Sequence, residues 1–357
     1  MAADRTIFIT GFPGFIAERL AERLAVDAST AFYLLTLPSF AAAAEEAANG
    51  IAQRTGMDAG RFRIVEGDIT KPGLGILPEI QRAIRSETTD VFHLAAVYDL
   101  AVARDVAFDV NVGGTRNVNE FVRPMPSLRR YNYISTCYVA GRRRGHILES
   151  ELEHDAGFRN HYEASKYAAE VEVERLKADL PVTIFRPAVV VGDSKTGETA
   201  KYDGIYYLVR YLLRAPALLR VVNVGNPSVR LNLVPVDFVV DGMAALSTDP
   251  EAEGSTVALA DPSPLATSEL FDSIASELTG RTSILTPPAS LTEWTLMLPF
   301  TPSISGLPHA GVPYFFLEQT YDTRIGSALL AKHAITCPGF RDYVGNLLEF
   351  VKMHPKL

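Results

Sequence analysis

Short apolar runs alternate with segments of helical spacing through the first half of the chain. Apolar runs bounded by turn residues predict buried strands, and apolar residues at intervals of three or four predict helices. Predicted strands cover residues 5–10, 31–37, 62–68, 90–95, 131–135 and 182–186, and predicted helices cover 15–24, 40–55, 76–84, 111–122 and 167–176. This alternation is typical of a parallel sheet covered by helices on both faces. We therefore expect an α/β fold with a doubly wound parallel sheet.

The pattern changes after about Gly192, where proline and glycine become frequent and the alternation of strands and helices weakens. Helices are predicted at 265–278 and 342–351, and the apolar stretch 287–313 between them contains many prolines. We expect a smaller, mixed C-terminal region that binds substrate. The predicted division is a sheet domain at 1–192 plus about 222–250, and a substrate-binding region at about 193–221 plus 251–357.

Composition narrows the class of protein. The 357 residues are 47% hydrophobic, enough for a large core, and the net charge is −8. An acidic balance argues against non-specific nucleic-acid binding, which needs a basic face. The basic run Arg142–Arg144 is either a solvated loop or a contact for an anionic part of the substrate. Two cysteines, Cys137 and Cys337, are too few for a disulfide framework or a cysteine-rich zinc site, and we assign no metal.

The distribution of apolar residues also bears on location. The first ten residues do not resemble a signal peptide, and no run approaches the roughly 20 apolar residues of a membrane span. We expect a cytoplasmic protein that is a monomer or a homodimer.

A glycine turn lies between the first predicted strand and the first predicted helix. Gly11 allows a tight turn, Gly14 allows the backbone to approach a pyrophosphate, and the small side chain of Ala17 allows the helix to pack closely on the sheet. The N-terminus of the helix then presents unpaired N–H groups to phosphate. The alternative is an ordinary strand–helix turn. We interpret the turn as part of a Rossmann dinucleotide-binding domain, with cofactor contacts from Gly11, Phe12, Pro13, Gly14, Phe15 and Ile16.

The ends of the next strands indicate which dinucleotide binds. A carboxylate after the second strand favours NAD, and an arginine there favours NADP, but residues 36–39 contain neither. Arg54 is a candidate phosphate ligand or a surface helix residue. We favour NADP(H) over NAD(H). Asp68, followed by Ile69, is predicted to bind adenine, with a turn cap as the alternative. The small residues of 95–97, Ala95, Ala96 and Val97, leave room for the cofactor.

A tyrosine and a lysine four residues apart suggest the chemistry. Tyr162 and Lys166 share one face of the predicted helix, and a nearby ammonium lowers the pKa of a phenol. Such a phenol can protonate a carbonyl oxygen as general acid. Ser135 and Thr136 end the fifth predicted strand, and their hydroxyls are candidates to orient that oxygen. The same Tyr-x-x-x-Lys spacing also occurs by chance in many helices.

Several segments resemble the extended short-chain dehydrogenase/reductase family, and most of all its reductases of fatty acyl thioesters and fatty aldehydes. The resemblance covers roughly residues 5–245 through TGFPGFIA, GDITKPGLGI, VFHLAAVYDL, NVGGT, ISTCYVAG, YEASKYAAE, RPAVVVGDSKTGE and RLNLVPVDFVVD. It implies a catalytic set of Thr136, Tyr162 and Lys166, and cofactor contacts from Gly11, Gly14, Asp68, Ala95, Pro187, Ala188 and Val189, to which Tyr162 and Lys166 add their own. The sequence departs from the family at Leu37, where many members have an arginine, and at Pro13.

The substrate region is rich in aromatic residues. Clusters at 202–209, 294–300 and 314–317 are either an apolar channel for an acyl chain or ordinary core, and 294–300 is also a candidate for peripheral membrane contact. Predicted substrate contacts are Tyr98, Cys137 and Tyr206. His161, beside the tyrosine, is interpreted as structural.

These observations predict an NADP(H)-dependent reductase. Its substrate is a lipid-like acyl thioester, carried on CoA or on an acyl carrier protein, or a long-chain aldehyde. One alternative is a hydroxysteroid or other secondary-alcohol dehydrogenase with the same chemistry. Another is a dinucleotide-sensing protein without turnover, which needs the glycine turn but not the Tyr–Lys pair.

Overall fold

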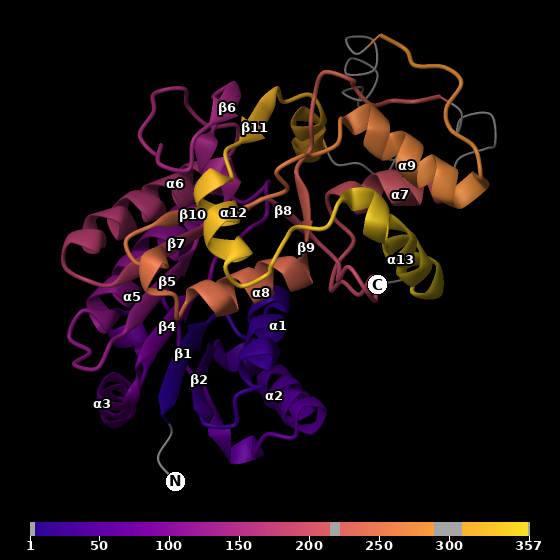
Figure 1. The fold of residues 1–357 in the computed structure, drawn as a ribbon. Coiled ribbons are helices and arrows are strands. Elements are labelled where there is room, and N and C mark those ends of the chain that lie inside the picture. Colours follow the sequence, from indigo (N-terminus) through magenta and orange to yellow (C-terminus); the bar gives the residue numbers. More distant parts are fainter. Residues whose placement is uncertain (1–3, 215–221, 289–308, 356–357) are drawn as a thin grey trace.

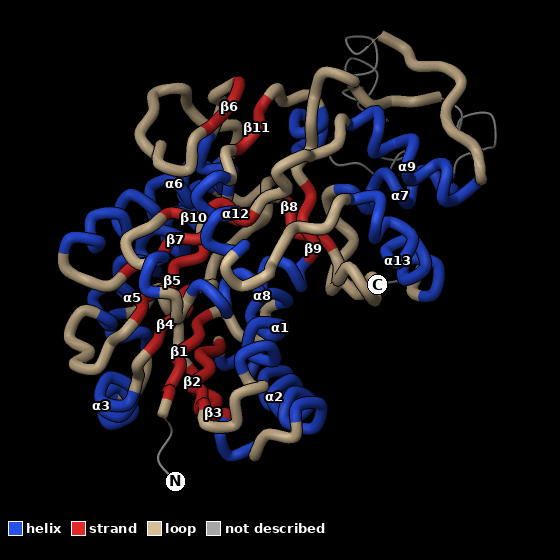
Figure 2. The backbone as a smooth tube through the Cα atoms, in the orientation of Figure 1, coloured by secondary structure: helices blue, strands red, loops and turns tan. Residues whose placement is uncertain are grey.

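A seven-stranded parallel sheet forms the centre of the molecule (Figures 1 and 2). The computed structural model describes residues 4–214, 222–288 and 309–355. The strand order across the sheet is β10-β7-β5-β4-β1-β2-β3. The strands are β1 (Arg5–Thr10), β2 (Thr30–Thr36), β3 (Phe62–Glu66), β4 (Asp90–His93), β5 (Arg130–Ile134), β7 (Val182–Pro187) and β10 (Thr256–Leu259). The expected doubly wound α/β fold is therefore confirmed.

Helices cover both faces of this sheet, and each face has its own apolar core. One face packs against α1 (Phe15–Leu24), α2 (Ala41–Thr55), α8 (Val236–Leu246) and α12 (Arg324–Ala331). The other packs against α3 (Pro78–Glu87), α5 (Gly114–Val122) and α6 (His161–Glu174) (Figure 1). Along β1, Ile7 and Ile9 belong to the first core and Phe8 to the second, because side chains alternate along a strand. Burial on both faces explains the unbroken apolar runs in the sequence.

A second cluster of helices lies beside the carboxyl end of the sheet (Figure 1). It contains α7 (Ile205–Arg214), α9 (Thr267–Thr279) and α13 (Phe340–Met353), which share an apolar core that includes Phe271 and Tyr343. The shorter elements include α4 (Arg104–Phe108) and two parallel strand pairs: β6 (Gly145–Ile147) with β11 (Gln319–Tyr321), and β8 (Val189–Val191) with β9 (Leu233–Pro235).

The structure differs from the predicted domain division at β10 and α12. Residues 251–357 were all expected in the substrate region, but β10 pairs with β7 and completes the main sheet, and α12 packs on β10. The strand is only four residues long and lies in a segment rich in proline and glycine, so its sequence carries little signal.

Candidate active site

The glycine turn follows β1 and places its backbone against the end of β4. Gly11 has φ +86°, a conformation that favours glycine, and a Cβ atom there would lie 2.8 Å from the backbone nitrogen of Ala95. A Cβ atom on Gly14 would lie 2.8 Å from the carbonyl oxygen of Gly11, to which the Gly14 N–H donates. No side chain caps α1, so its first N–H groups face outward from the turn. This bare backbone cradle beside a helix N-terminus fits the pyrophosphate of a dinucleotide.

The reversal of strand order between β1 and β4 places this cradle at a topological switch point, where ligands bind in open α/β sheets. The structure brings the predicted residues Gly11 and Ala95 together there. The Ala95 N–H donates to Thr10 Oγ1 at 3.1 Å. Val97 is held by Asn111, whose side chain accepts from the Val97 N–H at 2.9 Å and donates to its carbonyl at 3.0 Å. Sequence reasoning did not select Asn111, although an asparagine buried in a helix is a signal for such a role.

Asp68 lies at the end of β3, as predicted, but its carboxylate makes a local turn. Its Oδ1 accepts hydrogen bonds from the Thr70 N–H at 2.9 Å and the Thr70 hydroxyl at 2.8 Å. The turn-cap alternative is therefore present in the structure, and contact with adenine stays a prediction. Ile69 is buried, and its carbonyl accepts from Asn117 Nδ2 on α5.

Arg54 is placed far along α2 from the end of β2. It lies in the last turn of this 15-residue helix, where its Nε donates to Glu22 of α1 at 2.7 Å. An α-helix rises about 1.5 Å per residue, so this position is roughly 20 Å from the start of α2, which follows β2. The structure thus assigns Arg54 to a helix–helix ion pair and not to a cofactor phosphate.

The predicted catalytic set converges at the end of β5 and the start of α6. Thr136 caps a short turn at Cys137–Ala140 by accepting from the Tyr138 N–H at 3.2 Å. Asn160 caps α6 by accepting from the Glu163 N–H at 2.9 Å, so the helix begins at the residue before Tyr162. The hydroxyls of Thr136 and Tyr162 are neighbours, and Thr136 lowers the pKa of Tyr162 against the larger effect of burial. Two local caps therefore set the geometry of the hydroxyl pair.

Lys166 lies one turn further along α6 and is buried. Its amine donates to Tyr133 Oη at 3.0 Å and to the carbonyl of Ile134 at 2.8 Å. Burial lowers the pKa of Lys166 to about 8, and the charge of Glu170 opposes this shift.

The electrostatics of Tyr162 differ from the sequence-based expectation. Burial raises its pKa to about 12, against a smaller lowering by Thr136. Lys166 does not contribute the expected lowering of the Tyr162 pKa. The physical reason is that desolvation of the phenolate dominates, while the ammonium is directed toward Tyr133 and Ile134.

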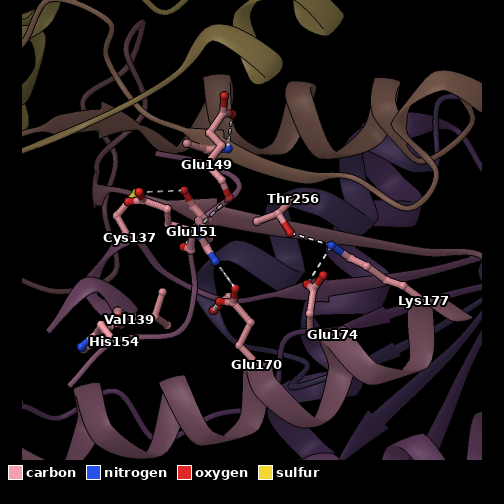
Figure 3. Close-up of polar contacts among 12 residues, drawn as sticks. Cys137, Val139, Glu149, Glu151, His154, Glu170, Glu174, Lys177 and Thr256 are labelled. Atoms are coloured by element: carbon pink, nitrogen blue, oxygen red, sulfur yellow. Dashed lines mark hydrogen bonds and ion pairs between the residues drawn. The ribbon is translucent and has the colours of Figure 1, made fainter. Parts of the chain in front are cut away.

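A buried ionic network lies next to this site, and Figure 3 shows the contacts of Glu149 and Glu170 within it. Glu170 of α6 accepts from Arg186 Nε at 2.8 Å and from the Ser135 hydroxyl. Arg186 also donates to the carbonyl of Glu149 at 3.0 Å, and the Glu149 carboxylate accepts from the Ala258 N–H of β10 at 2.8 Å. Ser135 therefore anchors the strand end instead of facing the catalytic hydroxyls. Sequence reasoning missed Glu170 and Arg186, although an arginine inside the apolar run VTIFRP is a signal.

Arg186 immediately precedes the predicted cofactor residues Pro187, Ala188 and Val189. Pro187 ends β7 next to β10, and the Ala188 N–H donates to the carbonyl of Leu259 at 3.0 Å. Val189 begins the short strand β8. The chain thus leaves the carboxyl end of the main sheet at this point. Contact of these three residues with a cofactor stays a prediction.

The predicted substrate contacts are dispersed. Tyr98 is 60% exposed, with the Lys201 ammonium 5.3 Å from its ring centre. Cys137 is buried, donates to the carbonyl of Arg186 at 3.2 Å, and has a thiol pKa raised by burial. Tyr206 is buried in the core of α7, α9 and α13, and its Oη accepts from the Gly192 N–H at 2.9 Å. Of the three, the structure leaves only Tyr98 open to a ligand from solvent.

The aromatic segments expected to form a channel have different outcomes. Tyr202 and Ile205 belong to the same core as Tyr206, which is the packing alternative. Residues 294–300 lie outside the described part of the chain. Tyr314 packs its ring 4.6 Å from that of Tyr138 and donates to Glu163 at 2.5 Å, beside Tyr162. The C-terminal region therefore contacts the turn that follows Thr136 and the first turn of α6, which holds Tyr162.

His161 is exposed at the first position of α6. In the described residues, no group of three or more His, Cys, Asp or Glu side chains could hold a metal ion. No helix within those same ranges has both the length and the apolar content to cross a membrane.

Comparison with known proteins agrees with this architecture. The chain is 24% identical over 281 residues to the fatty acyl-CoA reductase wat of Drosophila melanogaster, covering 69% of this chain and 54% of that protein. It thus spans about half the length of such curated relatives. The fold is similar to the terminal R domain of the myxalamid PKS-NRPS pathway, with a TM-score of 0.82, 24% identity, and coverage of 100% of this chain and 92% of that one.

A thiolation-reductase di-domain from an archaeal non-ribosomal peptide synthetase has a TM-score of 0.76 at 18% identity, with coverage of 98% of this chain and 76% of that one. The family model described as male sterility protein, an NAD-binding domain, matches residues 9–243. That match covers more than half of the chain and includes both the glycine turn and the catalytic set. The protein therefore belongs to the male sterility family of NAD-binding proteins, within the extended short-chain dehydrogenases/reductases.

Proposed function

We propose that the protein is an NADP(H)-dependent reductase of the carbonyl group in a lipid-like acyl thioester or long-chain aldehyde. The observation that carries this proposal is that Thr136, Tyr162 and Lys166 meet at the carboxyl end of β5, which pairs with β4, the strand whose end the glycine turn contacts. A dinucleotide-sensing protein has no need for such a hydroxyl pair. The similarity to a fatty acyl-CoA reductase and to a terminal reductase domain supports a thioester substrate.

The dinucleotide, when bound, supplies the hydride for the reduction. The residues of the chain then manage the oxygen of the substrate. With a pKa of about 12, Tyr162 keeps its proton at neutral pH. It is nevertheless a stronger acid than an alcohol, so it can protonate the alkoxide that hydride transfer to the carbonyl produces. It is therefore a suitable proton donor. Thr136, the neighbour of Tyr162, orients the same oxygen, and Lys166 holds the cofactor.

The choice of NADP(H) depends on the end of β2. Residues 36–39 contain no carboxylate that would repel a 2′-phosphate, and Leu37 is exposed there. Because Arg54 is paired with Glu22, it gives no support to this choice. Calorimetric titration with NADPH and NADH measures the preference directly, and we expect tighter binding of NADPH.

The substrate is proposed to arrive on CoA or on an acyl carrier protein. The archaeal di-domain of similar fold contains a thiolation domain together with a reductase, which supports delivery of the substrate by a carrier. Reduction of a thioester gives an aldehyde when the hemithioacetal collapses and the thiol leaves. A second hydride transfer gives an alcohol.

The test is oxidation of NADPH with long-chain acyl-CoA, long-chain aldehydes and 3-ketosteroids as alternative hydride acceptors. We expect turnover with one of the first two. Tyr162→Phe should lower kcat by about 10²–10⁴-fold, the usual contribution of a general acid, while the Kd for NADPH is preserved.

The matched control is Tyr167→Phe. Tyr167 lies on the same helix, but its ring packs against His154 and Phe158, away from the hydroxyl pair. Full activity of Tyr162→Phe would overturn the mechanism. NADPH binding without turnover on any substrate would favour the sensor, and turnover on 3-ketosteroids alone would favour the secondary-alcohol dehydrogenase.

A further inference from the structure

The buried ammonium of Lys166 is held by the strand beneath it. An ammonium has three N–H donors. One donates to Tyr133 Oη at 3.0 Å and a second to the carbonyl of Ile134 at 2.8 Å. The nitrogen also lies 4.6 Å from the centre of the Tyr133 ring. Among the described residues the third donor has no partner. Because two donors are anchored, the direction of the third is determined.

The hydroxyl of Tyr133 adjoins a chain of buried hydrogen bonds. Thr115 of α5 lowers the pKa of Tyr133 against the larger effect of burial, and the Oγ1 of Thr115 lies 3.0 Å from His93 Nε2. His93 Nδ1 lies 2.7 Å from Thr10 Oγ1, which accepts from the Ala95 N–H. All of these side chains are buried. The chain links β5, α5, β4 and β1, and it ends at the backbone that lines the glycine turn.

His93 fits this chain only as a neutral ring. Burial and the charge of Lys166 lower its pKa to about 3, so the imidazole is uncharged at neutral pH. One ring nitrogen then donates and the other accepts, which suits a histidine between two hydroxyls. A neutral ring also adds no charge that would repel the ammonium.

We propose that Tyr133 is a positioning residue that anchors Lys166, and that Thr115, His93 and Thr10 tie this anchor to the glycine turn. The single unanchored N–H of Lys166 is then the donor that contacts the dinucleotide. This inference rests on the proposed function only in assigning Lys166 to the cofactor. It gives a role to a buried tyrosine outside the catalytic set.

The anchor has a consequence for pH dependence. The titratable groups around Lys166 are Tyr162 and Glu170 on its own helix, Tyr133 on β5 and His93 on β4. Glu170 is the one anion among them, and it is already paired with Arg186. Tyr133 accepts from the charged form of the amine, so loss of its hydroxyl disfavours that form and lowers the pKa of Lys166. Affinity for the dinucleotide is present while the amine is charged and is lost as pH rises through this pKa.

The experiment measures NADPH binding by calorimetry from about pH 6 to about pH 10, together with thermal unfolding, for the wild type and two variants. Tyr133→Phe removes the anchoring hydroxyl. Tyr131→Phe is the matched control, because Tyr131 is also fully buried, lies two residues earlier on the same strand, and donates to Asn119 at 2.8 Å instead of contacting Lys166.

We expect Tyr133→Phe to move the midpoint of the pH-dependent loss of affinity down by about one pH unit, as a hydrogen bond to a charged group implies. Between the two midpoints its affinity for NADPH should be weaker than that of the wild type by up to about threefold. Tyr131→Phe should keep the wild-type midpoint and lose only thermal stability.

An unchanged midpoint in Tyr133→Phe, or an equal change in both variants, would overturn the proposal. If Tyr133→Phe does not fold, Thr115→Val interrupts the chain one step further on and should move the midpoint in the same direction by less; no movement there overturns the proposal as well. Binding does not depend on turnover. A protein that binds NADPH with the expected midpoints but reduces no substrate would refute the proposed function alone.

Discussion

The close approach of the glycine turn to β4 predicts an unequal effect of two glycine-to-alanine substitutions. Gly11 has φ +86° and Gly56, after α2, has φ +73°. Alanine at either position pays about 1–2 kcal/mol for the left-handed backbone and regains about 0.4–1 kcal/mol because the unfolded chain loses entropy. These contributions are common to both sites. Gly56→Ala should therefore lower the free energy of unfolding by about 0–1.5 kcal/mol, since no atom lies within 4 Å of its new Cβ.

Gly11→Ala carries an additional steric cost. Its Cβ would lie 2.8 Å from the nitrogen and 2.9 Å from the Cα of Ala95, which are backbone atoms that cannot rotate away. Overpacking of this kind costs about 1–3 kcal/mol, so the total loss should be about 1–4.5 kcal/mol. Because the strain is relieved by moving the turn away from β4, affinity for NADPH should also fall by at least about tenfold, which corresponds to about 1.4 kcal/mol.

Urea unfolding followed by circular dichroism measures the first effect, and calorimetric titration with NADPH the second. The comparison requires equal m-values in the two variants, so that a difference in midpoint reports stability. Equal losses of stability for Gly11→Ala and Gly56→Ala, with NADPH affinity retained in both, would refute the argument that the turn lies against the end of β4.

Two further predictions concern buried charges. Replacing Lys166 by methionine removes a cation that burial disfavours, so thermal stability should be unchanged or higher while NADPH affinity falls by about tenfold. The pKa of Lys166 is about 8 in the folded protein and ordinarily 10.5, so the unfolded chain binds more protons between these two pH values. The free energy of unfolding of the wild type therefore receives a contribution from Lys166 that increases with pH over this range. In Lys166→Met this pH-dependent contribution should vanish. If the full rise persisted, it would not come from the lowered pKa of Lys166. Glu170→Gln leaves Arg186 buried without its ion pair and should lower the free energy of unfolding in urea by about 3–5 kcal/mol. Glu172→Gln breaks a partly exposed ion pair on the same helix and should lower it by less than about 1 kcal/mol. Similar losses in both would show that the Glu170 pair is not isolated from solvent as described.

Much of the Rossmann half could be predicted because its signals are local. A strand buried on both faces requires an unbroken apolar run, so β1, β2 and β5 were found near their observed limits. The turn at Gly11 follows from the residue type that its backbone requires. The helix predicted at 167–176 begins earlier, at His161, because Asn160 caps it. The same local rules found no strand at Thr256–Leu259, because a four-residue strand is specified mainly by the partner that it pairs with.

The sequence by itself determined which residues make up the candidate site: the glycine turn, the Thr136 and Tyr162 hydroxyls, and Lys166 on the same helix. Only the tertiary structure decided their electrostatic state. Desolvation and long-range hydrogen bonds depend on which segments meet in space, and these brought Tyr133 of β5 to the ammonium and Glu170 to Arg186. For that reason the pKa of Tyr162 is raised by burial instead of lowered by Lys166, its neighbour on the helix. Spacing along the chain cannot reveal the direction of this shift.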